Sequence, residues 1–305
     1  MLLTIAIPSF NRPESALQAV KNLLESAKLP EEIQVILANN GSSEAGYNFV
    51  EQFLDQKPNA SYLSFSDNLG FAGNFLRLIQ NCESKYVLTM SDEDDLNIAE
   101  LQGLVQNLKS KSPDLCILRS FTSKQNATKK LRAKKLKGAS SSMSGIIFNL
   151  DSLRPQWPKI SNLISAEEFG SLYPQVIIAL VLFSQGDSLL CSTPTISSRS
   201  QLPTTIRSSN GNVYWHPTER VYQYLSLNRC IERIGKEFKL ISNRKLDSFR
   251  KANKRKFFGS ILDAISTIEP EIVMDFTRSS LTTAVNTEIR TLFRKFRIFI
   301  TRIFE

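Results

Sequence analysis

The sequence predicts an α/β fold, in which helices cover both faces of a mainly parallel sheet, followed by a mostly helical C-terminal region. Over residues 1–120, short apolar runs that suit buried strands alternate with longer stretches that suit helices. The first four apolar runs each end in a polar cluster. Because ligands bind beyond the carboxyl ends of the strands in such sheets, we expect these clusters to meet at one edge.

The elements expected in the first 120 residues follow from local signals. Pro8 ends a first strand, and Asn11 and Pro13 provide a cap and a first helical position. The turn residues 39–42 end a second strand. The expected strands are 2–7, 33–38, 62–65, 86–90 and 115–118. The expected helices are 13–24, 47–54, one that ends near residue 81, and 97–108.

The periodic pattern weakens after residue 120. Residues 122–142 are rich in Lys, Arg, Ser and Asn, which predicts a mobile basic loop. This loop either helps to hold a phosphate-bearing ligand or is simply solvated. The expected later segments are a strand at 145–149, irregular chain at 157–170, a helix at 172–183, a strand at 188–192 and helices within 217–305. The predicted domains are 1–215, with halves 1–120 and 121–215, and the helical region 216–305.

Charge is distributed unevenly along this chain, whose net charge is +9. The first 100 residues hold 6 Lys and Arg against 14 Asp and Glu, so the remainder is strongly basic. An acidic half suits a cation, and a basic half suits phosphates or an anionic membrane. The basic residues are scattered and lack interleaved aromatic residues, so we expect no nucleic-acid partner.

Cysteine usage and the N-terminus point to a cytoplasmic location. The 4 Cys residues include no C-x-x-C pair, which disfavours zinc or dithiol chemistry. The N-terminal residues lack the pattern of a signal peptide, and the longest apolar run, 176–183, is too short to span a bilayer.

Four consecutive acids, Asp92, Glu93, Asp94 and Asp95, follow the expected strand 86–90. Four adjacent like charges repel one another, and a solvated loop or a bound cation would relieve the repulsion. Hard divalent cations such as Mg²⁺ prefer carboxylate and phosphate oxygens. The alternative is an acidic turn that only caps the next helix, and we expect Asp95 to occupy that helix start in either case.

Four motifs in order resemble the family 2 glycosyltransferases of GT-A fold. They are LTIAIPSFNR at 3–12, ILANNGSS at 36–43, NLGFAGN at 68–74 and YVLTMSDED at 86–94. The resemblance covers residues 3–120 well and extends loosely to about 185. It implies a Rossmann-like, mainly parallel sheet and an inverting enzyme with a nucleotide-sugar donor, of the kind that builds bacterial surface polysaccharides.

The resemblance also implies roles for individual residues. The nucleotide pocket would be lined by Pro8, Ser9, Asn11 and Arg12, and the ribose side held by Asn68, Gly70 and Asn74. Asn39 stands where the family usually has an Asp that contacts the base; its amide can both donate and accept, which departs from the usual uracil contact and leaves thymidine or another base open. The expected donor is a UDP- or dTDP-sugar. Asp92, Glu93 and Asp94 match the D-x-D motif. Asp94 would bind Mg²⁺ or Mn²⁺, with Asp92 near both the metal and the ribose.

Several of these residues have a purely structural alternative. Gly41 and Gly70 would permit turns, Asn68 would cap a helix, and Pro8 would end a strand.

The catalytic base of an inverting transfer must be a carboxylate on the acceptor side. Glu168 lies shortly before the expected helix 172–183 and is the candidate, with Glu167 and then Asp187 as alternatives. The family's usual Glu-Asp pair is absent here. The predicted function is transfer of a hexosyl or deoxyhexosyl group to a saccharide or lipid-linked saccharide; the alternative is a non-catalytic nucleotide-sugar-binding protein.

The C-terminal residues 286–304 combine an apolar, Phe-containing stripe with Arg and Lys on other faces. This pattern is typical of an interfacial helix on anionic lipid, here the inner face of the plasma membrane. The alternative is that the stripe packs on the protein or on a second subunit.

Overall fold

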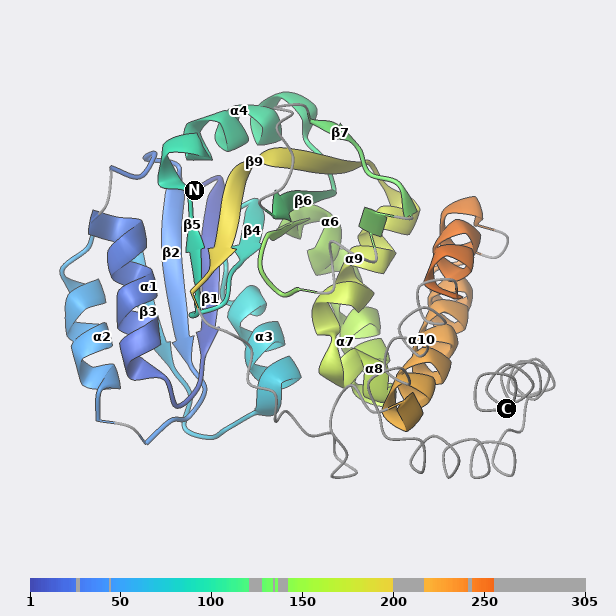
Figure 1. The fold of residues 1–305 in the computed structure, drawn as a ribbon, viewed down its shortest axis with the longest axis horizontal. Coiled ribbons are helices and arrows are strands. Elements are labelled where there is room, and N and C mark those ends of the chain that lie inside the picture. The colour runs from blue at the N-terminus through green and yellow to red at the C-terminus, as the bar shows by residue number, and fades with distance from the viewer. Residues whose placement is uncertain are drawn as a thin grey trace, which may run out of the picture. The chain divides into compact units, whose positions relative to one another are not determined.

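The fold is built on one large sheet with helices on both faces (Figure 1). The computed structural model describes residues 1–25, 28–43, 45–120, 128–133, 135–136, 142–199, 217–240 and 243–254. The strands are β1 Leu3–Ser9, β2 Ile33–Asn39, β3 Ala60–Ser64, β4 Tyr86–Thr89, β5 Asp94–Leu96, β6 Leu115–Ser120, β7 Lys129–Lys130, β8 Ile146–Asn149 and β9 Ser188–Ser198. The main helices are α1 Pro13–Glu25, α2 Tyr47–Asp55, α3 Gly70–Gln80, α4 Leu101–Lys111, α6 Leu150–Leu153, α7 Trp157–Ala166, α8 Glu168–Leu172, α9 Pro174–Gln185 and α10 Pro217–Glu237. Two 3-10 turns are η1 Ile98–Glu100 and η2 Arg154–Gln156.

Strand order in the sheet is β3-β2-β1-β4-β8-β6-β9-β5, and β7 pairs with β9. The first four strands in this order are parallel. Strand β8 runs antiparallel between β4 and β6, so β6 and its parallel neighbour β9 point the same way as β4. Within the described strands only β5, β7 and β8 run in the opposite direction, which confirms the mainly parallel sheet.

Both faces of the sheet are buried, which explains the continuous apolar runs in its central strands. All seven residues of β1 are buried. Successive side chains in a strand point to opposite faces. Accordingly, Ile5 and Ile7 join the core that includes α1, α2 and α4, whereas Ala6 joins the core that includes α3 and α7–α9.

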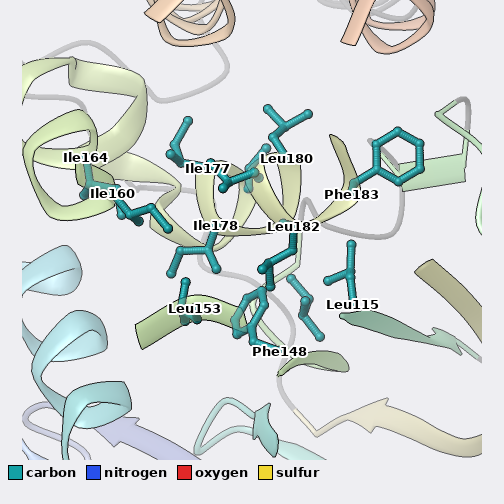
Figure 2. Close-up of a cluster of buried hydrophobic side chains, with 14 of the residues drawn as sticks. Leu115, Phe148, Leu153, Ile160, Ile164, Ile177, Ile178, Leu180, Leu182 and Phe183 are labelled. Atoms are coloured by element: carbon teal, nitrogen blue, oxygen red, sulfur yellow. The ribbon is translucent and has the colours of Figure 1, made fainter. Parts of the chain in front are cut away.

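Helix α9 forms the centre of the second core and is buried all round. Ile178 and Leu182 point toward Phe148 of β8, while Ile177 and Leu180 point away from it (Figure 2). Both sides of α9 are apolar. The sheet covers one side, and further core residues belong to the same hydrophobic cluster, including Leu227 and Ile231 of α10. No helix in the described part of the chain is both long and apolar enough to cross a membrane.

Three local expectations are wrong. Residues 157–170 are not irregular but form α7 and α8, because Ile160, Leu163 and Ile164 give α7 a buried stripe at helical spacing. Asp95 does not begin a helix, since it pairs with Ser197 in the β5–β9 ladder.

The basic loop is the third of these. Parts of residues 122–142 lie outside the described residues, but the described part forms β7 and buries Leu131 and Leu136. Lys129 and Lys130 pair with Leu190 and Leu189 near the start of β9, at the amino edge of the sheet. These two lysines are therefore at the edge opposite to the polar strand ends and are not placed to hold an acceptor there.

The C-terminal region is described only in part. Residues 226–252 form one compact unit with residues 1–202. Both the predicted boundary near residue 215 and the segment 286–304 lie outside the described residues, so the domain limits stay a prediction.

We predict that Phe148→Ala lowers the free energy of unfolding by about 3–5 kcal/mol, because it leaves a cavity between β8 and α9. The Phe148 side chain is fully buried. The control is Phe49→Ala on α2, a side chain that is 64% exposed, which should change stability by less than about 0.5 kcal/mol. Urea unfolding of both variants measures the difference, and equal losses would contradict the packing described here.

Candidate active site

The polar residues that follow β1, β2 and β3 meet at the carboxyl edge of the sheet, as the sequence predicts. The amide of Asn40 donates to the carbonyl of Ser9 at 3.0 Å, and the amide of Phe65 donates to the carbonyl of Asn39 at 3.0 Å. Gly41 has a φ of +70°, and a Cβ there would come within 2.7 Å of the backbone nitrogen of Asn68. Only glycine therefore allows the loops after β2 and β3 to approach this closely.

Asp92 is the buried centre of the edge, with none of its surface exposed. Ser9 Oγ donates to Asp92 Oδ2 at 2.5 Å, and Ser9 Oγ lies 2.6 Å from Tyr47 Oη. Because the Ser9 hydroxyl has a single proton, the Tyr47 hydroxyl donates to Ser9. Burial raises the pKa of Asp92, while the positive charge of Arg12 and the bond from Ser9 act in the opposite direction.

Arg12 binds two of the four acids in separate contacts. One terminal nitrogen lies 3.0 Å from Asp92 Oδ1, and the other lies 2.8 Å from Glu93 Oε2. Asn11 adopts a left-handed φ of 53° and donates its amide to Ser42 Oγ at 2.9 Å. This turn places Arg12 against the acidic loop, and its role beside a nucleotide pocket stays a prediction.

Asp94 has different surroundings from the other acids. It is the first residue of β5, opposite Ser198 of β9, and Ser144 Oγ donates to its Oδ2. Burial raises the pKa of the Asp94 carboxyl, which the hydroxyls of Ser144 and Ser198 partly counteract. The described residues include no ion pair between Asp94 and a Lys or Arg side chain within 4.0 Å.

This donor set fits a divalent cation held mainly by phosphates. Within the described residues, no group of three or more His, Cys, Asp or Glu side chains could hold a metal ion alone. Mg²⁺ commonly takes one or two carboxylates and completes its shell with water and substrate phosphate. Asp94 suits that arrangement, whereas both oxygens of Asp92 already accept from Ser9 and Arg12. The assignment of either residue to a metal stays a prediction.

Asn40 is a buried residue that joins the loops after β2 and β3 at the carboxyl edge, a role that the sequence alone does not indicate. Its side chain is 3% exposed, accepts from the amide of Leu69 at 3.0 Å and donates to Asn68 Oδ1 at 2.9 Å. Asn68 Oδ1 also accepts from the amide of Gly70 at 2.9 Å. The turn tetrad 39–42 marked the position of Asn40, but the local pattern did not identify its partners 28 to 30 residues away.

The two remaining predicted amide side chains are also buried. Asn39 accepts from the amide of Ser42 at 3.0 Å and is hydrogen-bonded to Tyr62. Asn74, on α3, is 3% exposed, and its Oδ1 has no hydrogen-bond partner within the described part of the chain. Pro8 is paired with Ala38 in the β1–β2 ladder.

The three candidate bases have different positions. Glu167 caps α8 and is engaged, since its Oε2 lies 2.8 Å from Arg229 Nε and 3.2 Å from Ser226 Oγ. Glu168 is the first residue of α8 and is partly exposed. Helix α8 packs against α3, the helix that begins at the carboxyl edge (Figure 1). Asp187 precedes β9 at the amino edge, so this alternative is wrong.

A mainly parallel sheet with helices on both faces and an acidic loop after β4 matches the GT-A fold of glycosyltransferases. A model of the family described as glycosyl transferase family 2 matches residues 4–165, slightly more than half of the 305 residues, and the chain belongs to this family.

Solved structures with low sequence identity share this fold. The first, S. aureus TarS residues 1–349 in complex with UDP, is 13% identical with a TM-score of 0.61, over 98% of this chain and 87% of that one. The second, the mannosyltransferase PcManGT from Pyrobaculum calidifontis in complex with GDP-Man and Mn²⁺, is 9% identical with a TM-score of 0.54, over 96% and 83%.

A curated relative matches over a shorter stretch. It is the uncharacterized glycosyltransferase MG025 homolog of Mycoplasma pneumoniae, 30% identical over 99 residues. The match spans 32% of this chain and 33% of the relative's length.

We predict that, without divalent metal, Asp94→Asn is at least as stable as the wild type at neutral pH. The pKa of Asp94 is raised in the folded state above an ordinary value of 3.8, so folding favours its protonated form. The wild type therefore loses stability as the pH rises from about 4 through the raised pKa, and the Asn variant does not. Thermal unfolding from about pH 4 to pH 7 should show the variant's advantage growing with pH.

The control for this experiment is Asp187→Asn, a side chain that is 81% exposed. It should show no such trend. If the stability difference between Asp94→Asn and the wild type decreased as the pH rises, the raised pKa of Asp94 would be contradicted.

Proposed function

We propose that this protein is an inverting glycosyltransferase that moves a sugar from a nucleotide-sugar donor to a saccharide or lipid-linked saccharide acceptor. The observation that supports this proposal is the arrangement of the acids at the carboxyl edge of the sheet in a family 2 chain. Arg12 and Ser9 bind Asp92. Among the described hydrogen bonds and ion pairs, the Asp94 carboxylate is bound by hydroxyl groups and by no Lys or Arg. UDP bound to TarS and GDP-Man with Mn²⁺ bound to PcManGT support a nucleoside diphosphate and a divalent cation here.

In this proposal, different residues at the carboxyl edge bind different parts of the donor. Pro8, Ser9, Asn11 and Arg12 line the nucleotide side, with Asn39 at the base. Asn68, Gly70 and Asn74 face the ribose side from the start of α3, and Asp92 supports them. Asp94 holds Mg²⁺ or Mn²⁺, which when bound stabilises the charge that develops on the departing diphosphate. We propose a UDP- or dTDP-sugar that carries a hexosyl or deoxyhexosyl group as the donor; Asn39 replaces the Asp that the family usually places at the base, so another base is the alternative.

Glu168 acts as the general base in this proposal. The acceptor hydroxyl gives its proton to the Glu168 carboxylate as its oxygen forms the new glycosidic bond, and the bond between the sugar carbon and the diphosphate oxygen breaks. Glu167 is unsuited because it already accepts from Arg229 and Ser226. The adjacent Glu168 makes no such contact among the described hydrogen bonds and ion pairs and starts a helix that packs on α3.

We predict that Asp94→Asn abolishes metal-dependent donor binding. A ligand that binds only the folded state raises its melting temperature, so a thermal-shift screen of UDP-, GDP-, CDP- and dTDP-sugars with Mn²⁺ or Mg²⁺ identifies the donor. The wild type and Asp187→Asn should show a shift that needs the metal, and Asp94→Asn should not. If Asp94→Asn showed a metal-dependent rise in melting temperature as large as that of the wild type, Asp94 would not be a metal ligand.

We predict that Glu168→Gln retains donor affinity and lowers the transfer rate by roughly 10²–10⁴-fold, the usual scale for loss of a general base. Asp187→Asn, at the opposite edge, should transfer at the wild-type rate. Wild-type turnover in Glu168→Gln would exclude Glu168 as the base. Donor binding by a wild-type protein that turns over no acceptor would instead favour a non-catalytic nucleotide-sugar-binding protein.

We predict that residues 286–304, which lie outside the described residues, bind an anionic membrane surface. Each basic residue near such a surface contributes about 1 kcal/mol, so the 5 Lys and Arg residues in this segment should give a salt-sensitive attachment. Truncation after Asn286 should release the protein from anionic vesicles in a flotation assay while donor binding persists. Full-length protein that ignores such vesicles at low salt would show that the segment packs on protein.

A further inference from the structure

The four acids at the edge have different partners, and this difference assigns them different tasks. Arg12 neutralises Asp92 and Glu93 from the side of β1. Asp95 accepts from Asn22 of α1 at 2.7 Å and pairs with Arg199 at 3.2 Å. Asp94 is the member with no Lys or Arg side chain within 4.0 Å in the described chain; Arg199 acts on it only over a longer distance, so no direct ion pair neutralises its charge.

Arg199, which directly follows β9, holds this turn by its backbone as well as by its side chain. Its amide donates to the carbonyl of Glu93 at 2.8 Å. Its guanidinium donates to the carbonyl of Asp92 at 2.5 Å and to the carbonyl of Ser15 in α1 at 3.3 Å. Only 25% of the side chain is exposed.

These contacts bracket Asp94 on both sides in the sequence. Arg199 fixes the carbonyls of Asp92 and Glu93 just before Asp94 and the carboxylate of Asp95 just after it. The guanidinium and the backbone amide of Arg199 together make these three contacts with the turn, which restrict its rotation. A planar guanidinium reaches several acceptors at once, which a single ammonium cannot do in the same geometry.

We infer that Arg199 is a positioning residue that holds the Asp92–Asp95 turn so that Asp94 presents its carboxylate to a divalent cation on the donor diphosphate. This inference rests on the proposed function. Groups that orient a metal ligand typically change metal affinity by roughly 10–100-fold when they are removed. Arg199 touches neither metal nor substrate in this assignment and acts through the turn.

The test is the affinity for Mn²⁺, followed by the electron paramagnetic resonance signal of free Mn²⁺ with UDP, GDP, CDP or dTDP present. Arg199→Ala should weaken Mn²⁺ binding by roughly 10–100-fold. Arg199→Lys keeps the positive charge and guards against loss of folding, yet it should still bind Mn²⁺ more weakly than the wild type. Wild-type affinity in either variant would overturn the inference.

Arg154→Ala is the matched control. Arg154 donates to the carbonyls of Cys82 at 3.0 Å and Ser84 at 3.1 Å and pairs with Asp151, so it fastens the loop that enters β4 as Arg199 fastens the turn that leaves it. Its removal should lower the melting temperature and leave Mn²⁺ affinity unchanged. An equal loss of Mn²⁺ affinity in Arg154→Ala and Arg199→Ala would show that Arg199 only stabilises the fold, and would overturn the inference.

Different results would contradict the proposed function and the role of Arg199. A wild-type protein that binds no Mn²⁺ with any of the four nucleoside diphosphates would overturn the proposed function, and the inference with it. Wild-type binding that Arg199→Ala leaves intact would overturn the inference alone.

Discussion

The crowding of four carboxylates at the end of a buried strand is the constraint on which this edge of the molecule depends. Burial disfavours the charged form of Asp92 and Asp94, and mutual repulsion adds to that cost. The fold offsets it with Arg12 after β1, Arg199 after β9 and the Ser144 hydroxyl before β8. Three segments far apart in the sequence are therefore tied to one turn.

Strand β8 explains how the second half of the chain reaches that turn. It inserts antiparallel between β4 and β6, which brings Ser144 beside Asp94 and lets β9 return along β6. The last residues of β9 then pair with β5, so the acidic turn is itself the outermost part of the sheet. The acidic turn contributed by the first half, which we propose as part of the donor site, is thus held by hydrogen bonds from the second half.

The sequence was sufficient where the signal was local. The strands β1, β2 and β4 carry mainly apolar, buried runs followed by turn residues, and their convergence with the shorter, half-exposed β3 follows from parallel topology. It was insufficient for Ser144 and Arg199, whose partners lie 50 and 107 residues away and leave no periodic pattern. Helix α7 is a different case, because its apolar stripe is present in the sequence but Pro155 and Pro158 lie at its start and obscure the helical pattern.

Glu167 and Glu168 show how one residue step separates a structural carboxylate from a candidate catalytic one. Glu167 has extended backbone, with φ −134° and ψ 134°, whereas Glu168 is the first helical residue, so the two side chains leave the chain in different directions. Glu167 anchors Ser226 and Arg229 of α10, and Ser226 Oγ also accepts from the amide of Phe169 at 3.0 Å. These contacts fix the direction of α8 and hence of Glu168. Ser226 and Arg229 therefore support α8, and a fragment that ends before residue 226 would leave α8 without these contacts.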